Sequence, residues 1–201
     1  MSNIKKLLTD WSMFDYTKSS ITESRAKNGG KIVMKGILQK ADTLNQNGRV
    51  YPSIILEREL RNYQKFIKEN RALGECDHPE SSVVELQNAS HVIREAWMEN
   101  GIVYGQVELL DTPKGKILQS LVESGITLGI SSRGVGSTKQ EGDRQVVQDD
   151  FQLICWDFVS EPSTPGAFMM REGKLVESRE INRQFNKTDR IDRVFNDILD
   201  W

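Results

Sequence analysis

The sequence of 201 residues is poor in cysteine and histidine. It contains two cysteines, Cys76 and Cys155, and two histidines, His78 and His91. Two cysteines do not make a disulfide framework in a chain of this length, so a reducing, cytoplasmic setting is expected. Because histidine is so rare here, a histidine in a specialised local setting is a candidate for chemistry.

The sequence also lacks long apolar runs and an excess of charge of one sign. No stretch of about 18 apolar residues occurs, and the N-terminus lacks the apolar segment of a signal peptide. The formal net charge is −2, with the basic residues scattered along the chain. These absences argue against a membrane span and give no reason to expect binding to nucleic acid or to a membrane.

What is present predicts one sheet-dominated α+β domain between two polar tails. Residues 1–30 are predicted to be an N-terminal tail, in which the spacing of Leu7, Leu8, Trp11 and Phe14 indicates a short helix. Residues 31–170 are predicted to be the domain. Residues 171–201 are predicted to be a polar C-terminal tail that ends in an amphipathic helix over 188–201.

Local signals define the elements of the domain. Extended patterns predict strands over 31–38, 83–97, 102–110, 126–137 and 145–159, with an Asn-Gly hairpin signal between the second and the third. Pro52 begins a helix that runs to about Asn70, and Thr112-Pro113 begins another that ends before Gly125. Residues 141–143 are predicted to form a turn.

Two segments point to acyl transfer. Ser131 and Ser132 end an apolar run and are followed by Arg133 and Gly134, while His78 lies between an acidic residue and a proline. A serine hydroxyl needs a neighbouring base, usually a neutral imidazole, and the oxyanion needs preorganised donors. Either serine is therefore a candidate nucleophile and His78 a candidate base, with Arg133 and Gly134 as oxyanion or backbone support.

Other interpretations of the same residues remain open. The Ser-Ser-Arg-Gly segment is also typical of a polar turn, and a histidine before a proline is typical of a capped loop. Cys76 lies two residues from His78, so a thiol nucleophile or a zinc hydrolase built on Cys76, His78 and His91 is an alternative. A four-ligand zinc site usually has a second close pair of ligands, and the sequence has none.

Taken in order, several motifs resemble one family. They are Asn47-Gly48-Arg49-Val50-Tyr51-Pro52, Leu73-Gly74-Glu75-Cys76-Asp77-His78-Pro79, Leu110-Asp111-Thr112-Pro113-Lys114-Gly115, Gly129-Ile130-Ser131-Ser132-Arg133-Gly134-Val135-Gly136 and Trp156-Asp157-Phe158-Val159. This set, spread from about Gly36 to Ala167, resembles the prohead core proteases of T-even-type tailed phages, which are serine proteases related to herpesvirus assemblin.

The resemblance implies a fold and a catalytic set. The fold would be an assemblin-like antiparallel β-barrel core flanked by helices. Ser131, which follows a Gly-x step, would be the nucleophile and His78 the base, without any metal or cofactor. Herpesvirus relatives use a second histidine after the serine; none follows Ser131 here, so Asp157 is favoured as the third member and His91 is the alternative.

The resemblance also implies a role. The enzyme would act inside the immature prohead, in the host cytoplasm, on scaffold, core and major capsid proteins, with a homo-oligomer as an option. Family cleavage follows glutamate in (Ile/Leu)-x-Glu sequences. Ile21-Thr22-Glu23-Ser24 and Leu175-Val176-Glu177-Ser178 fit this pattern in the two predicted tails, so a zymogen that trims both of its ends is expected. A catalytically inactive scaffold domain of the same fold is the structural alternative.

Overall fold

The structure of the protein, a computed structural model, describes residues 6–13, 18–77, 79 and 81–160. All of these lie in one compact unit, Met1–Met170. Residues 1–5, 14–17, 78, 80 and 161–201 lie outside the described residues. Three predictions therefore concern residues outside the described part of the chain: His78, the predicted cleavage site Glu177–Ser178 and the predicted helix over 188–201.

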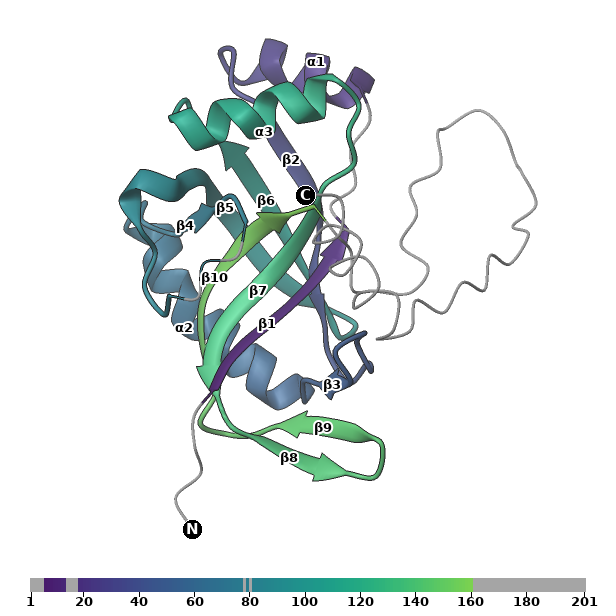
Figure 1. The fold of residues 1–201 in the computed structure, drawn as a ribbon. Coiled ribbons are helices and arrows are strands. Elements are labelled where there is room, and N and C mark those ends of the chain that lie inside the picture. The colour runs from purple at the N-terminus through teal and green to yellow at the C-terminus, as the bar shows by residue number, and fades with distance from the viewer. Residues whose placement is uncertain (1–5, 14–17, 78, 80, 161–201) are drawn as a thin grey trace, which may run out of the picture. The chain divides into compact units, whose positions relative to one another are not determined.

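The described chain is mostly sheet with a few helices, as the sequence predicts (Figure 1). In chain order the elements are β1 (Lys6–Met13), α1 (Lys18–Lys27), β2 (Val33–Lys40), β3 (Arg49–Val50), α2 (Ser53–Lys68), β4 (Leu73–Glu75), the 3₁₀ helix η1 (Leu86–Asn88), β5 (Ala89–Glu99), β6 (Ile102–Leu109), α3 (Pro113–Glu123), β7 (Gly129–Gly136), β8 (Thr138–Glu141), β9 (Arg144–Val147) and β10 (Gln152–Val159).

The strands form three sheets. Their orders are β1-β7-β10, β2-β6-β5-β4 and β3-β9-β8. An isolated parallel bridge between Cys76 and Phe158 continues β4 alongside β10, which brings the first two sheets together. The expected closed barrel is not formed among the described residues, because the strands divide into these separate sheets.

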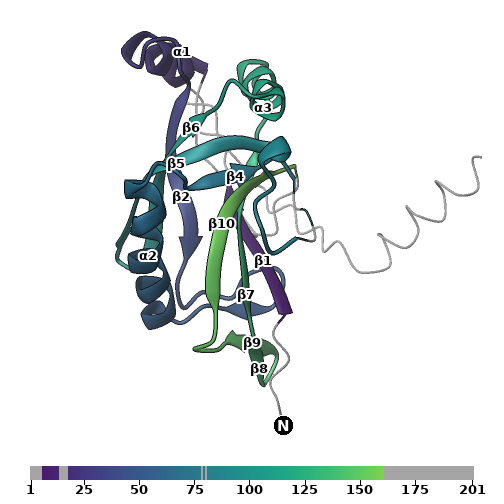
Figure 2. The same ribbon diagram turned by 90° about the vertical axis from the view of Figure 1, so that its left-hand side faces the viewer.

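The core lies where α2 meets the sheets. The helix places Ile55, Leu56, Leu60 and Tyr63 on one buried face, as the sequence spacing predicts. It packs against β5 and β10 (Figure 2). The Tyr63 ring meets the buried Trp156 ring of β10 edge to face, at 4.8 Å between centroids. This contact fixes β10, and with it the neighbouring β7, relative to the helix.

Two further local predictions are confirmed. Thr112 caps α3, since its hydroxyl accepts a hydrogen bond from the amide of Gly115 at 3.0 Å. Asn100 and Gly101 join β5 to β6 with positive φ values of 50° and 77°, the conformation that a two-residue hairpin requires. The predicted strand over 145–159 is divided into β9 and β10, and the predicted strand over 83–97 begins only at Ala89.

The N-terminal segment corrects the predicted local structure. Residues 6–13 form a strand instead of a helix, because all eight pair in antiparallel register with β7. The later part of the predicted tail contains the helix α1. Ser24 of this helix lies buried, and its hydroxyl bonds both the amide and the carbonyl of Val33. No helix in the described part of the chain is long and apolar enough to cross a membrane.

Candidate active site

Ser131 lies in the middle of β7, between two paired strands. In the register it stands opposite Trp11 of β1 and opposite Asp157 of β10. Because side chains alternate along a strand, Ser131 and Arg133 share the face of Asp157, while Ser132 lies on the other face opposite Trp156. Ser131 is completely buried, at 0% exposure.

His78 lies outside the described residues, but the chain on its N-terminal side is placed. The amide of Asp77 donates to the carbonyl of Phe158 at 2.8 Å, next to the Cys76–Phe158 bridge. Phe158 is the neighbour of Asp157 and stands opposite Ile130, the residue before Ser131. Asp77 has φ of 68°, a left-handed conformation that aspartate tolerates better than most residues. The chain therefore approaches His78 directly beside the serine-bearing pair of strands.

Asp157 is the centre of a buried polar network. Its Oδ1 accepts from the amide of Glu75 at 3.0 Å, from Arg133 Nη2 at 3.1 Å and from Cys155 Sγ at 3.2 Å, and its Oδ2 lies 2.8 Å from Arg133 Nε. Burial raises the pKa of the Cys155 thiol well above its usual range, and the neighbouring Asp157 charge adds to the effect. Cys155 is therefore a neutral donor to this carboxylate.

His91, the alternative third member, is held by other partners. Its Nε2 lies 2.9 Å from the carbonyl oxygen of Trp156, and its Nδ1 lies 2.9 Å from Ser90 Oγ. A carbonyl can only accept, so Nε2 carries the proton and Nδ1 accepts from the hydroxyl. Burial lowers the pKa of His91 from 6.5 to about 4, against the opposing effects of the Asp157 charge and the Trp156 carbonyl. His91 is thus a neutral residue of the core.

The environment of His91 also explains a glycine. A Cβ atom on Gly74 would lie 2.1 Å from the carbonyl oxygen of Trp156 and 2.2 Å from His91 Nε2. Only glycine allows β4 to approach this closely.

The zinc alternative finds no support at His91. Because both ring nitrogens of His91 are engaged in the core, the geometry gives them no role as zinc ligands. Among the residues that the structure describes, no group of three or more His, Cys, Asp or Glu side chains could hold a metal.

Arg133 and Gly134, the expected oxyanion or backbone support, are neighbours on β7 and lie on opposite faces of the strand. The guanidinium of Arg133 is 0% exposed and is engaged with Glu75 and Asp157. A Cβ on Gly134 would lie 2.4 Å from the Phe151 ring, so this glycine is required by packing on the face away from Ser131. In the ladders Gly134 pairs with Leu8 and with Leu153.

Glu75 is the functional candidate that sequence reasoning undervalued. Its carboxylate is fully buried and lies 2.5 Å from Arg133 Nη2. In the sequence Glu75 appears only as a member of the histidine motif, without a role of its own. The signal that was available is Arg133 itself, because a cation inside an apolar strand requires buried acidic partners.

Only one of the two predicted self-cleavage sites lies among the described residues. Glu23–Ser24 lies inside α1, and Ser24 is anchored to Val33. Glu177–Ser178 lies outside the described residues. Five further glutamates end an (Ile/Leu)-x-Glu triplet. Four of them lie in helices or strands, Glu57 in α2, Glu75 in β4, Glu95 in β5 and Glu123 in α3, and Glu69 directly follows α2.

Comparisons with known proteins identify the class and the family of this chain. The model of the family described as "Prohead core protein serine protease" matches residues 13–180, and the chain belongs to this family. It is a phage prohead protease.

The individual relatives agree. The chain is 32% identical over 163 residues to the prohead core protein protease of Enterobacteria phage T4, covering 79% of this chain and 76% of that protein. Its structure is similar to that of gp21, the bacteriophage T4 capsid assembly protease, with a TM-score of 0.69, 25% identity, and coverage of 80% of this chain and 100% of that one.

Proposed function

We propose that the chain is a serine endopeptidase that matures the phage prohead by cutting scaffold, core and major capsid proteins after glutamate in (Ile/Leu)-x-Glu sequences. Its place of action is the inside of the immature prohead, in the host cytoplasm. An assemblin-like relationship is part of this proposal, supported by the order His78, Ser131, Asp157 along the chain.

One observation carries the catalytic assignment. Ser131 stands opposite Asp157 in the β7–β10 register, and Asp77, which precedes His78, is hydrogen bonded to Phe158. Consecutive Cα atoms are about 3.8 Å apart, so a base that follows Asp77 needs only a short reach to the serine strand. Asp157 is preferred to His91 as the third member because Asp157 stands opposite Ser131 in the register, whereas His91 pairs with Gly74 and Leu109.

The proposed reaction follows from these roles. His78 takes the proton of Ser131 Oγ as the oxygen attacks the main-chain carbonyl carbon of the glutamate, and the imidazolium then protonates the amine of the leaving residue. Water, activated by the same imidazole, hydrolyses the acyl-enzyme. Asp157 stabilises the imidazolium.

The burial of Ser131 supports the proposal that the chain is a zymogen. Ser131 is 0% exposed, and β1 occupies the whole outer edge of β7. An extended substrate that pairs with a sheet needs such an edge. The hydrogen-bonding groups of consecutive residues alternate between the two neighbouring strands, so one amide of the Arg133–Gly134 pair faces β1. We propose that release of β1 frees this amide as an oxyanion donor and opens the edge to substrate.

Self-trimming is proposed to follow the same logic. A cut after Glu23 would separate β1 from the rest of the domain, and a cut after Glu177 would remove the predicted C-terminal helix. Because Glu23–Ser24 lies in α1, this helix must open before the bond can enter an active site. The cut after Glu23 is therefore expected to be slow and to be made by a second copy of the chain, or by copies within a homo-oligomer.

The test is an intact-mass time course of the purified full chain. Wild type and Ser132→Ala should convert to the fragment Ser24–Glu177 and should cut an Ile-Thr-Glu-Ser peptide, whereas Ser131→Ala and His78→Ala should do neither. Identical conversion of Ser131→Ala would indicate a contaminating protease. A wild type that stays intact and leaves the peptide uncut would support the inactive scaffold domain instead.

A further inference from the structure

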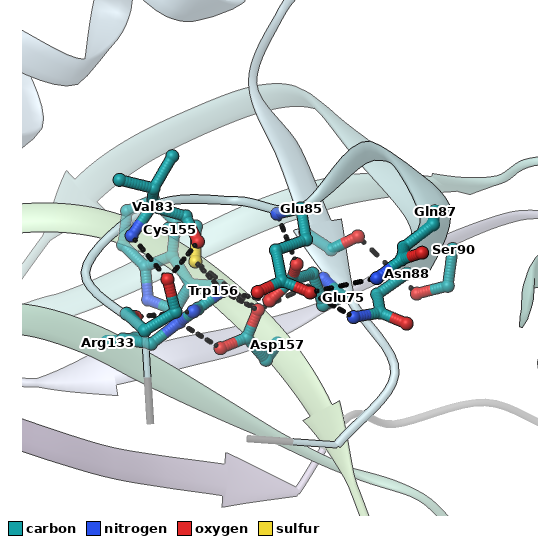
Figure 3. Close-up of polar contacts among 12 residues, drawn as sticks. Glu75, Val83, Glu85, Gln87, Asn88, Ser90, Arg133, Cys155, Trp156 and Asp157 are labelled. Carbon is teal, nitrogen blue, oxygen red and sulfur yellow. Dashed lines mark hydrogen bonds and ion pairs between the residues drawn. The ribbon is translucent and has the colours of Figure 1, made fainter. Parts of the chain in front are cut away.

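Three segments that are distant in sequence, residues 75–85, β7 and β10, meet at the buried guanidinium of Arg133 (Figure 3). Its Nη2 lies 2.5 Å from Glu75 Oε2, at the end of β4, and 3.1 Å from Asp157 Oδ1 on β10. Its Nε lies 2.8 Å from Asp157 Oδ2. Its Nη1 donates to the carbonyl oxygen of Ser81, in the loop that follows His78, at 2.8 Å.

Glu75 extends this network to the far end of the same loop. Its Oε1 accepts from the amide of Glu85 at 2.5 Å, and its own amide donates to Asp157 Oδ1 at 3.0 Å. The segment from Glu75 to Glu85 is thus tied to β7 and β10 at Glu75 and to β7 at Ser81, and its end is held through the bond from Glu85 to Glu75. Asp77 adds a fourth tie through the carbonyl of Phe158.

The chemistry of this centre requires arginine. One planar guanidinium bonds two carboxylates and a carbonyl in three directions, and a lysine ammonium cannot reproduce this fork. Burial alone would lower the pKa of Arg133, but the charges around it, including those of Asp157 and Glu75, raise it above the ordinary value. Arg133 therefore remains charged, and every donor and acceptor around it depends on the others.

We propose that Arg133 and Glu75 are positioning residues for the reaction. They hold the segment 75–85, which carries the proposed base, against the strand of Ser131, and they act through this segment without touching the substrate. This inference rests on the proposed function. It replaces the expected oxyanion role of the Arg133 side chain, because its guanidinium is already committed to β4, β10 and the loop.

The first test uses Glu75→Gln in the full-length chain. The amide has nearly the same shape, but its nitrogen would oppose either Arg133 Nη2 or the amide of Glu85, because each oxygen of Glu75 accepts from one of them. The matched control is Glu59→Gln, which changes another buried glutamate. Among the described residues its hydrogen bonds come from Arg58, Asn62 and the amide of Leu153, all outside the segment 75–85. The readouts are kcat and KM on an Ile-Thr-Glu-Ser peptide, and amide hydrogen exchange of Asp77 and Glu85.

We expect Glu75→Gln to lower kcat by about 10-fold or more, with KM changed by less than about 3-fold, and to accelerate exchange at Asp77 and Glu85. Glu59→Gln should keep kcat within about 3-fold even where its loss of stability is similar. Equal losses of kcat in the two variants at matched stability would overturn the proposal. So would a loss of kcat in Glu75→Gln without faster exchange in the segment.

A second pair of variants leaves the buried charges untouched. Glu85→Pro removes the amide that donates to Glu75, while Glu85→Ala keeps it. The φ of Glu85, −87°, is near the value that proline imposes. Glu85→Pro should lose several-fold in kcat and Glu85→Ala should match wild type; equal activity of the two would contradict the positioning role. Full activity of Ser131→Ala would instead refute the proposed function itself.

Discussion

The two edges of β7, the strand that carries Ser131, are held in different ways. On the β10 edge the ladder is reinforced by the ion pairs of Arg133 and by the Trp156–Tyr63 contact. On the β1 edge, the ladder is made by a segment that precedes the helix containing the predicted cut at Glu23. One edge belongs to the catalytic framework, and the other is formed by a strand that proteolysis would detach.

This difference separates what must stay from what must move. A buried charge network is costly to break in part, because removal of one partner leaves the others unpaired in a medium that solvates them poorly. A strand at the edge of a sheet can be exchanged for another strand that offers the same main-chain groups. Changes on the β10 side should therefore lower stability or activity, whereas changes that weaken the pairing of β1 should raise activity.

The largest effect on stability is expected from Gly74→Ala, which pushes β4 away from the β10 side. The added methyl would overlap the Trp156 carbonyl and His91, both of which are fixed, so we expect a loss of about 3 kcal/mol in the free energy of unfolding. Denaturant titration measures it. Gly142→Ala is the control, since its Cβ meets nothing within 4 Å and only its φ of 63° costs about 1 kcal/mol. Equal losses in the two variants would contradict the packing described for β4.

A comparable effect is expected from pH, through His91. Its pKa is about 4 in the folded protein against 6.5 for the free side chain. Between these values the unfolded state binds the extra proton, so the stabilising contribution is complete above pH 6.5 and is lost as the pH falls toward 4. The loss amounts to about 3 kcal/mol.

Denaturant titrations at several pH values check this. The pKa of Glu108 is also lowered, chiefly by its hydrogen bond to Arg94, and it adds a loss only in the more acidic range below its ordinary pKa of 4.5. The interval from pH 6.5 to 5 therefore lies above the range of Glu108, and a His78→Ala background removes the other histidine of the chain. A free energy of unfolding that stays flat across that interval would show that His91 is not held neutral in the core.

On the β1 edge, Leu8→Ala should increase proteolytic activity, whereas changes on the β10 side should decrease it. Leu8 is buried at 2% exposure, and its truncation should weaken the docking of β1 by about 2 kcal/mol. We expect faster amide exchange in β1, unchanged exchange in β5 and β6, and faster cleavage of an Ile-Thr-Glu-Ser peptide. Slower cleavage would mean that β1 supports the active site instead of covering it.

The smallest effect is expected from Cys155→Ala on the β10 edge. This change removes one neutral S–H donor to Asp157 and leaves both contacts of that carboxylate with Arg133 in place. We expect a loss of about 1 kcal/mol in the free energy of unfolding and a modest decrease in kcat. A variant as inactive as Glu75→Gln would show that the thiol, and not the ionic part of the network, sets the geometry.

What could be predicted from the sequence is what local chemistry determines. The apolar face of α2, the Thr112 cap and the Asn100-Gly101 turn each depend on residues within one or two helical turns or one hairpin. The strand β1 was not predicted, because the spacing of Leu7, Leu8 and Trp11 also fits a helix and its partner β7 lies far along the chain. Pairing with β7 overrides that local pattern.

In the candidate site, too, local motifs predicted some residues, and only the tertiary structure shows the others. Ser131 and His78 follow from their motifs, and their roles remain predictions. The partners of Arg133 do not follow, because Glu75 and Asp157 are separated from it by 58 and 24 residues. Nothing local distinguishes an arginine that contacts an oxyanion from one that ties together three segments; only the tertiary contacts make that distinction.

The most direct test of the central claim is the site of covalent modification by a fluorophosphonate. Such a reagent forms an ester only with a serine whose proton is taken up by a neighbouring base. After prolonged incubation of the full chain with the reagent, peptide mass mapping should find the label on Ser131 in wild type and in Ser132→Ala, and none in Ser131→Ala or His78→Ala. Label on Ser132, or equal labelling of His78→Ala, would contradict the account.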